Sequence, residues 1–329
     1  MRAIFINGFG GPDVLQLREV PLPAPGRGEV RVRVRATAVN RADLLQRQGV
    51  YPAPPDAPPD IPGLEFAGEI DAVGDAVIDL LPGDRVFGLC GGGAYAEAVV
   101  VHARTVVRMP PALSFDEGAA IPEAFITAWD ALVTQAHLTA GEHVLIQAAG
   151  SGVGTAAIQI ARAIGARSFG TARTADKLER ARALGLDEGV PVAAGAVGGF
   201  ADAVLRTTGG RGTDVVLELV GGAYLTEDLL CVAPRGRIVL VGVMAGAHAE
   251  LDLRQILHKR VQITGTVLRA RPLEEKIAAV QQLGRHLVPL IARGTLRAVI
   301  DRVLPLARAA EAHAYVASNA GFGKVVLSV

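Results

Sequence analysis

The sequence predicts an α/β protein in which a strand-rich first third is followed by a doubly wound parallel sheet. Residues 30–36 alternate apolar and charged side chains, the two-residue period of a strand with one face in water. From about residue 124 short apolar runs alternate with helical segments, as they do around a parallel sheet. A glycine-rich turn at 150–154 joins one such run to a helix. A chain of 329 residues is long enough for two domains.

The first third contains further strand candidates at 65–70, 84–89 and 94–101, each short and bounded by glycine or proline. Many short strands of this kind indicate a compact antiparallel or barrel-like unit. Residues 51–59 contain five prolines. Because proline fixes φ and lacks an N–H donor, this segment is predicted to be a stiff surface loop, which we place at the mouth of a site.

The rest of the chain supplies the elements of the parallel sheet and of a closing segment. Residues 214–219 and 237–242 are almost continuously apolar, the pattern of strands covered on both faces. We expect strands at 143–147, 168–170, 214–219, 237–242, 261–265 and 324–329, and helices at 155–165, 175–184 and 273–293.

Composition and charge exclude several classes of protein. Lys+Arg and Asp+Glu are 33 each, so the chain has no basic field to attract nucleic acid or an anionic membrane. Two cysteines cannot build a disulfide scaffold or a four-cysteine zinc site, and they suit a reducing compartment. The first ten residues lack the pattern of a signal peptide, and no apolar run approaches the ~18–20 residues of a membrane span. We therefore expect a cytoplasmic protein.

The glycine-rich turn has the context of a dinucleotide-binding site. Small residues between a strand and a helix let the backbone approach a pyrophosphate, whose charge meets the helix N-terminus. In the G-x-G-x-x-G frame that ends at Gly154, Ala149 and Ser151 occupy the first two glycine positions. An ordinary tight strand-to-helix turn remains the alternative. The predicted cofactor contacts here are Gly150, Ser151, Gly152, Val153 and Gly154.

The end of the second strand indicates which dinucleotide binds. An enzyme specific for NAD carries an acidic residue about 20 positions after the glycines, to bind the ribose hydroxyls. Here the strand ends in residues 170–174, which include Thr171 and Arg173, and Lys177 follows one helical turn later. Two cations and no carboxylate at the tip favour a 2′-phosphate, and so NADPH. The alternative is that Arg173 and Lys177 form a solvated face at a helix start.

Several segments together identify a family. They are residues 39–51, 63–68, 81–86, 120–129 and 151–159. Over its whole length the chain resembles the medium-chain dehydrogenase/reductase superfamily, in the zinc-free quinone oxidoreductase branch that includes zeta-crystallin. Residues 40–44 and 46–49, together with Ser151 in the turn, resemble the damage-inducible NADPH quinone oxidoreductase subgroup.

The resemblance implies a GroES-like β-barrel catalytic domain, residues 1–123 plus 267–329, and a Rossmann NADP-binding domain, residues 124–266. It implies an active site in the cleft and a homodimer joined through edge strands, here residues 261–266. Zinc-dependent relatives hold their metal with Cys and His where this chain has Asn40 and Leu64, neither of which supplies such a ligand. We therefore expect no metal, and an acceptor that takes a hydride readily.

The resemblance also assigns roles to residues outside the turn. Asn40, Tyr51 and Ser151 are the predicted catalytic residues, with Tyr51 as a hydrogen-bond or proton donor. The alternative for Tyr51 is packing against the prolines, and that for Ser151 is a small residue suited to the turn. Asp43 either holds Asn40 or Arg41 in place or forms a surface salt bridge. Further cofactor contacts are assigned to Asn40, Thr127, Gly242, Val243, Phe322 and Lys324.

One departure weakens the cofactor assignment, because Val192 stands where related reductases often place a tyrosine against the adenine side. The predicted function is NADPH-dependent quinone reduction. The alternatives are reduction of an alkenal, enone or enoyl-thioester double bond and, outside enzymes, a zeta-crystallin-like RNA-binding or structural protein. The zero net charge argues against RNA and the glycine turn against a purely structural role.

Overall fold

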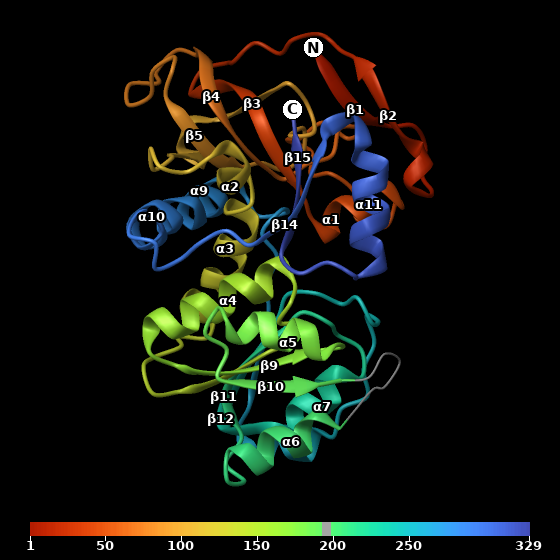
Figure 1. The fold of residues 1–329 in the computed structure, drawn as a ribbon, viewed down its shortest axis with the longest axis vertical. Helices are drawn as coiled ribbons and strands as arrows, with labels where there is room; N and C mark the ends of the chain where they lie inside the picture. Colours follow the sequence, from red (N-terminus) through yellow and green to blue (C-terminus); the bar gives the residue numbers. More distant parts are fainter. Residues whose placement is uncertain (193–198) are drawn as a thin grey trace. The chain divides into compact units, whose positions relative to one another are not determined.

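The computed structural model describes residues 1–192 and 199–329, which form two compact units. Unit 1 consists of Met1–Ile126 and Leu268–Val329, and unit 2 of Thr127–Val267. Figure 1 shows their elements along the chain. No helix of the described residues is both long and apolar enough to cross a membrane.

Unit 1 is built on a seven-stranded sheet with the order β14-β15-β3-β4-β5-β7, and β6 also pairs with β3. Its neighbours are antiparallel except for β14 and β15. In β3 the valines at 30, 32 and 34 are buried and the arginines at 33 and 35 are exposed, as the alternation predicts. The strands are β3 (Glu29–Val39), β4 (Glu65–Val73), β5 (Arg85–Leu89), β6 (Ala98–His102), β7 (Val106–Arg108), β14 (Ile300–Pro305) and β15 (Lys324–Ser328).

Other elements of unit 1 surround this sheet, and several had no signal in the sequence. The pair β1 (Arg2–Ile6) and β2 (Leu15–Glu19) and the helices α1 (Arg41–Arg47) and α11 (Ala309–Ser318) were not predicted. The helix expected at 273–293 consists of α9 (Leu273–Gln282), a π-helical turn (Leu283–Leu287) and α10 (Val288–Ala292). The remaining helices are α2 (Phe115–Ala119) and α3 (Pro122–Trp129), which continues as a π-helix at Asp130–Gln135.

Unit 2 contains the predicted doubly wound sheet. Its six strands are all parallel, in the order β10-β9-β8-β11-β12-β13. Helices α4 and α5 lie on one face, and α6 and α7 lie on the other (Figure 1). The strands are β8 (His143–Ile146), β9 (Arg167–Ala172), β10 (Glu188–Pro191), β11 (Thr213–Glu218), β12 (Val232–Leu240) and β13 (Gln262–Gly265). The helices are α4 (Gly152–Ile164), α5 (Ala175–Arg182), α6 (Phe200–Thr207), α7 (Tyr224–Cys231) and α8 (Leu253–Lys259).

The strand order of the unit 2 sheet indicates which of its edges binds a ligand. The chain runs from β8 outward through β9 to β10, and then returns to build β11, β12 and β13 on the other side of β8. Ligands of such sheets bind outside the carboxyl ends of the strands where the order reverses. Ile146 of β8 pairs with Gly170 of β9, and Leu217 of β11 also pairs with Ile146, so these strands end side by side.

Candidate functional site

The glycine turn lies at the end of β8 and is closed tightly against α4. Ser151 caps this helix, because its hydroxyl accepts the N–H of Gly154 at 3.0 Å. A Cβ atom on Gly154 would lie 2.5 Å from the carbonyl oxygen of Ala148, so no larger residue fits there. This close packing is what the third glycine of a dinucleotide turn provides, and it leaves the first turn of α4 available to an anion.

A buried hydrogen-bond chain supports the turn from below. The Thr171 hydroxyl donates to Gln147 Oε1 at 2.5 Å and accepts the Ala148 N–H at 3.2 Å. Gln147 Nε2 in turn donates to Asp228 Oδ1 at 2.7 Å. Thr171, Gln147 and Asp228 are all at most 2% exposed. The Thr171 hydroxyl, predicted to contact a cofactor, is therefore turned inward, where it holds the turn in position.

The hydrogen-bond chain that starts at Thr171 ends at a pair of carboxyl groups. Glu218 and Asp228 are both fully buried. Glu218 Oε1 accepts the N–H groups of Val220 and Gly221, while Glu218 Oε2 and Asp228 Oδ2 have no hydrogen-bond partner among the described residues. Burial, and then the charge and hydrogen bond of Glu218, raise the pKa of Asp228 well above its usual range. A pKa raised in this way favours the neutral form of the Asp228 carboxyl, which could donate its proton to Glu218.

The tip of β9 carries the residues predicted to recognise a 2′-phosphate. Arg173 is exposed directly after the strand, and Thr174 caps α5 by accepting the Lys177 N–H at 3.4 Å. Asp176, the next carboxylate along the chain, lies 4.0 Å from Arg180. Half-buried Tyr224 lies close enough to Arg173 for that charge to act on the pKa of its phenol. The sequence analysis did not single out Tyr224. Val192, the departure noted in the sequence, is buried at 3% exposure.

Two further predicted contacts lie after β12, whose last residue, Leu240, pairs with Glu218 of β11. A Cβ atom on Gly242 would meet the Leu219 carbonyl oxygen at 2.7 Å, and Val243 is 54% exposed. The carboxyl ends of β8, β9, β11 and β12 therefore bring most of the predicted cofactor contacts to one edge of unit 2. They are Gly150, Ser151, Gly152, Val153, Gly154, Thr171, Arg173, Gly242 and Val243. Lys177 follows on α5, and Thr127, in α3, is 9% exposed.

Unit 1 contains the other predicted residues, arranged around a buried ion pair. Lys324 Nζ lies 2.7 Å from Glu65 Oε1, and it donates to Asn40 Oδ1 at 2.5 Å and to the Val39 carbonyl at 3.1 Å. Asn40 Nδ2 donates to the same Glu65 oxygen at 2.8 Å. All three protons of the Lys324 ammonium are thus used within unit 1. The Lys324 side chain is thus directed at Asn40 and Glu65, and its contact with a cofactor stays a prediction. Phe322, just before β15, is buried at 2% exposure.

Asp43 fixes the backbone around Asn40. One oxygen accepts the Asn40 N–H at 2.8 Å, and the other accepts the Gly63 N–H at 3.0 Å. The hydroxyl of Tyr95 donates to Asp43 at 3.3 Å. Asp43 is fully buried, and burial raises its pKa to about 6. Of the two roles open from the sequence, the surface salt bridge is wrong and Asp43 holds Asn40 in place.

Tyr51 is held by an arginine that sequence reasoning missed. The Arg269 guanidinium lies 5.4 Å from the centre of the Tyr51 ring and donates to the Tyr51 carbonyl at 3.2 Å. It also bonds Gln46 Oε1 at 2.6 Å and the Gly91 carbonyl at 2.8 Å. Burial raises the pKa of the Tyr51 phenol, which keeps it protonated at neutral pH. Because Arg269 is 3% exposed, this clamp is part of the core of unit 1.

Glu123 is a second residue that the sequence analysis did not single out. Its backbone N–H donates to Glu65 Oε2 at 2.8 Å. Burial, and then the charge of Glu65, raise the pKa of Glu123 to about 8. The only local signal was an acidic residue directly after Pro122 in an otherwise apolar stretch, residues 119–126.

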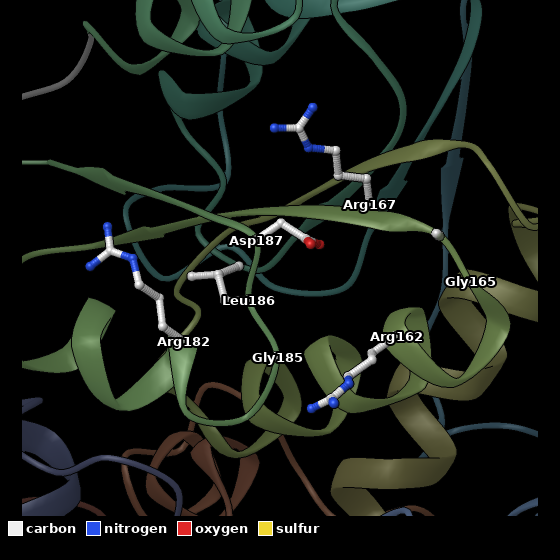
Figure 2. Close-up of a pocket in the computed structure, with 8 residues that line it drawn as sticks. Arg162, Gly165, Arg167, Arg182, Gly185, Leu186 and Asp187 are labelled. Atoms are coloured by element: carbon white, nitrogen blue, oxygen red, sulfur yellow. The ribbon is translucent and has the colours of Figure 1, made fainter.

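A surface depression of about 640 Å³ lies elsewhere on unit 2 (Figure 2). Its arginines are exposed, and two of them pair with neighbours, Arg167 with Glu188 at 2.8 Å and Arg182 with Glu179 at 3.1 Å. It adjoins Gly165 at the far end of the 13-residue helix α4, about 20 Å from the glycine turn. It is lined by Arg162, Gly165, Ala166, Arg167, Arg182, Gly185, Leu186 and Asp187, and is separate from the predicted cofactor site.

Comparison with known proteins relates this geometry to a family. Residues 26–111 match the alcohol dehydrogenase GroES-like domain, and residues 152–285 match the zinc-binding dehydrogenase domain. A quinone oxidoreductase of Lama guanicoe is 37% identical over 99% of this chain and 97% of its own. A pikromycin polyketide synthase component of Streptomyces venezuelae is 38% identical over 89% of this chain, which corresponds to 8% of that protein.

A solved structure of a quinone oxidoreductase supports the same family. The Escherichia coli quinone oxidoreductase complexed with NADPH is 29% identical, with a TM-score of 0.89 over 100% of both chains. The predicted combination of a GroES-like domain and a Rossmann-type parallel sheet is thereby confirmed. The chain belongs to the quinone oxidoreductase family of the medium-chain dehydrogenases/reductases, and it is an oxidoreductase.

Proposed function

We propose that this protein is an NADPH-dependent quinone oxidoreductase that works without a metal ion. The family membership and the NADPH-bound structure of the Escherichia coli relative support the reaction class and the cofactor. In this chain, the observation that carries the cofactor assignment is the cradle at Gly154, which a Cβ atom would fill. The tip of β9, with Arg173 and Lys177, favours the 2′-phosphate of NADPH over the ribose hydroxyl of NADH.

The residues of unit 2 divide the work of holding the dinucleotide. The backbone of 150–154 and the Ser151 hydroxyl would face the pyrophosphate, because the hydroxyl accepts from Gly154 and keeps its own proton to donate. Gly242 and Val243 would line the nicotinamide side, and Thr127 would help to orient that end. When bound, the nicotinamide supplies a hydride, that is, two electrons and one hydrogen nucleus.

The arrangement around Asn40 supports chemistry without a metal. Both ends of its amide are used, by the Lys324 ammonium and by Glu65. A divalent cation bound here would stand against the fixed positive charge of Lys324, and buried Leu64 offers no ligand. A Lewis acid assists hydride transfer to a simple ketone, whereas a quinone accepts a hydride readily because its product is aromatic.

Tyr51 is the proposed hydrogen-bond donor to the acceptor oxygen. The raised pKa of its phenol keeps the hydroxyl protonated, and the Arg269 clamp holds the start of the proline-rich loop in one position. A positioned, neutral donor of this kind stabilises negative charge that develops on the substrate oxygen. We expect Tyr51→Phe to lower quinone turnover by about 100- to 1,000-fold.

A cofactor and acceptor screen tests the proposal. Purified protein is mixed with NADPH or NADH and with an ortho-naphthoquinone or a simple enone, in the presence of a chelator. We expect fast oxidation of NADPH with the quinone and no effect of the chelator. Loss of activity on chelation would contradict the metal-free reaction, and turnover with NADH alone would remove the phosphate assignment.

The second candidate function is reduction of an activated double bond. The match of this chain to part of a polyketide synthase component favours it. The same screen separates the two functions, because turnover of the enone without turnover of the quinone would keep the cofactor and change the substrate class.

The exposed edge of the unit 2 sheet supports a proposed homodimer. Strand β13 ends that sheet, and three of its four residues are exposed. Pairing with a second copy would satisfy its outer backbone groups. Light scattering on the purified protein would give twice the chain mass of 34.1 kDa, and a monomer at micromolar concentration would contradict the proposal.

A further inference from the structure

The proline-rich loop of unit 1, residues 51–59, lies directly against a run of glycines. A Cβ atom on Gly91 would lie 2.7 Å from Pro54 Cγ and 3.1 Å from the methyl group of Ala57. A Cβ atom on Gly92 would lie 3.4 Å from the same methyl group. The loop therefore packs on bare backbone, and a side chain at Gly91 would push it away.

Arg269 ties both ends of this loop to the glycine run and to α1. Its guanidinium donates to the Gly91 carbonyl at 2.8 Å, the Tyr51 carbonyl at 3.2 Å and Gln46 Oε1 at 2.6 Å. Gln46 Nε2 in turn donates to the Pro59 carbonyl at 2.8 Å. Both side chains are buried, at 3% exposure for Arg269 and 2% for Gln46. Arg269 therefore holds the start of the loop directly and its end through Gln46.

The middle of the loop has a tether of its own. The ammonium group of Lys276, in α9, lies 3.2 Å from a carboxylate oxygen of Asp56. Lys276 is only 5% exposed, so this contact is also anchored in the interior of unit 1. Because proline fixes φ at five of the nine positions, the loop has little freedom between its three tethers.

The contacts of Arg269 fix both the backbone and the ring of Tyr51. Its three hydrogen bonds within the described part of the chain all go to neutral oxygen atoms. The planar guanidinium presents its donors in a rigid fork, which lets one side chain reach acceptors on three separate segments. It also lies 5.4 Å from the centre of the Tyr51 ring, within the range of a cation–π contact. One buried group thus sets the position of the half-buried tyrosine.

We propose that Arg269 is a positioning residue for quinone reduction, an inference that rests on the proposed role of Tyr51 as hydrogen-bond donor. Arg269 acts on the acceptor only through Tyr51, by holding this residue and the loop behind it in one arrangement before the acceptor binds. A donor fixed in advance loses no freedom when charge develops on the acceptor oxygen, and this lowers the barrier to reaction.

The first test compares the turnover of two arginine variants. Arg269→Met keeps an apolar side chain but removes the three hydrogen bonds and the cation. We expect kcat for the quinone to fall by about 100-fold, the effect of a displacement of about 1 Å, with KM for NADPH unchanged.

Arg85→Met is the matched control, because Arg85 makes the same kinds of contact elsewhere in unit 1. Its guanidinium donates to the carbonyls of Pro111 and Leu113, at 2.9 and 2.6 Å, and lies 4.6 Å from the centre of the Phe115 ring. A general effect of losing a guanidinium would lower kcat in both variants. We expect Arg85→Met to turn over quinone as the wild type does.

A double variant separates positioning from a merely structural role. If Arg269 acts through the Tyr51 phenol, Tyr51→Phe combined with Arg269→Met should have nearly the kcat of Tyr51→Phe alone. Two independent contributions would instead multiply their losses, and that result would overturn the inference.

A further measurement does not depend on turnover. In the loop, the Tyr51 N–H donates to the Leu45 carbonyl at 3.3 Å and the Ala57 N–H to the Pro54 carbonyl at 3.0 Å. In protein free of cofactor, exchange of these amide hydrogens for deuterium should be at least about tenfold faster in Arg269→Met, and unchanged in Arg85→Met. Gln46→Met, which removes the link to the end of the loop, covers the case in which Arg269→Met does not fold. It should speed exchange at Ala57 and lower kcat by about tenfold.

The outcomes separate this inference from the function on which it rests. If wild type reduces quinones and Arg269→Met keeps its kcat, or loses no more than Arg85→Met, Arg269 is not a positioning residue. Unchanged exchange of the loop amides in Arg269→Met would overturn the inference whatever the turnover. If wild type reduces no quinone, the proposed function fails and the inference fails with it, while faster exchange in Arg269→Met would show only that the clamp holds the loop.

Discussion

Unit 1 and unit 2 both bury carboxyl groups, and they neutralise them in different ways. In unit 1 Glu65 stays charged because the Lys324 ammonium lies 2.7 Å away and further donors complete its shell. In unit 2 burial and the charge of Glu218 raise the pKa of Asp228 well above its usual range, which favours its neutral form. Both solutions avoid an isolated buried charge, which would cost several kcal/mol.

The difference shows what each unit requires of its polar core. A buried ion pair leaves a fixed dipole beside Asn40, where the proposed reaction develops charge. A neutral Asp228 leaves a compact network that carries no second charge and links Gln147 to the glycine turn. Unit 1 is therefore sensitive to the loss of a cation, and unit 2 to the loss of a proton.

The largest effect should come from removing the cation of unit 1. Lys324→Met leaves Glu65 buried without its partner, and we expect a loss of about 3–5 kcal/mol in the free energy of unfolding. Urea denaturation measures this loss in the free energy of unfolding. Lys276→Met is the matched control, since Lys276 is also buried but its partner, Asp56, is 57% exposed and stays hydrated. Equal losses in the two variants would contradict the importance of the buried pair.

The Asp228 proton of unit 2 gives the next effect. Asp228→Ala leaves buried groups on Gln147 and Glu218 unpaired, at a cost of about 1–3 kcal/mol. Asp228→Asn, whose amide can accept from Gln147 and donate to Glu218, should lose less than about 1 kcal/mol. A larger loss in the asparagine variant would argue against a neutral Asp228.

The pH dependence of stability tests the same proton. The folded pKa of Asp228 lies above its unfolded value of 3.8, so the folded state binds more protons. The stabilisation of the folded state by the Asp228 proton is complete below pH 3.8. It is lost as the pH rises through the folded pKa of Asp228. Asp228→Asn should remove this part of the decline, which urea titrations across the pH range would show.

Filling the cradle should weaken the cofactor site without touching either carboxyl group. Gly154→Ala forces a Cβ atom against the Ala148 carbonyl, at a cost of about 1–3 kcal/mol in stability. The dissociation constant for NADPH should rise at least about tenfold, the equivalent of 1.4 kcal/mol. Gly265→Ala is the control, because no atom lies within 4 Å of a Cβ there. Unchanged NADPH binding in Gly154→Ala would contradict the cradle.

The smallest effect concerns the choice between cofactors. Arg173→Ala should weaken NADPH binding by about tenfold, the value of one charge-assisted hydrogen bond, and leave NADH binding nearly unchanged. Isothermal titration with each dinucleotide measures the ratio. An equal, small change for both would mean that Arg173 is a solvated residue at the start of α5.

The parts of the site that could be predicted lie within short stretches of chain. The turn at 150–154 has a local pattern, because its backbone and the start of α4 are neighbours in sequence. Asn40 and Tyr51 were found from the resemblance of residues 39–51 to a family. By contrast, Arg269 reaches Gln46 across 223 positions, and Lys324 reaches Asn40 across 284. No local pattern records such a pairing.

The sequence by itself determined the alternation of β3, the βα order of unit 2 and the glycine turn. These follow from side-chain periodicity and backbone sterics, which act between residues a few positions apart. Only the tertiary structure decided which ionisable groups share a partner. It set Lys324 against Glu65, turned Thr171 inward and buried Asp228 beside Glu218. The charge state of a buried group depends on its desolvation and its neighbours in space, and both arise only when distant segments fold together.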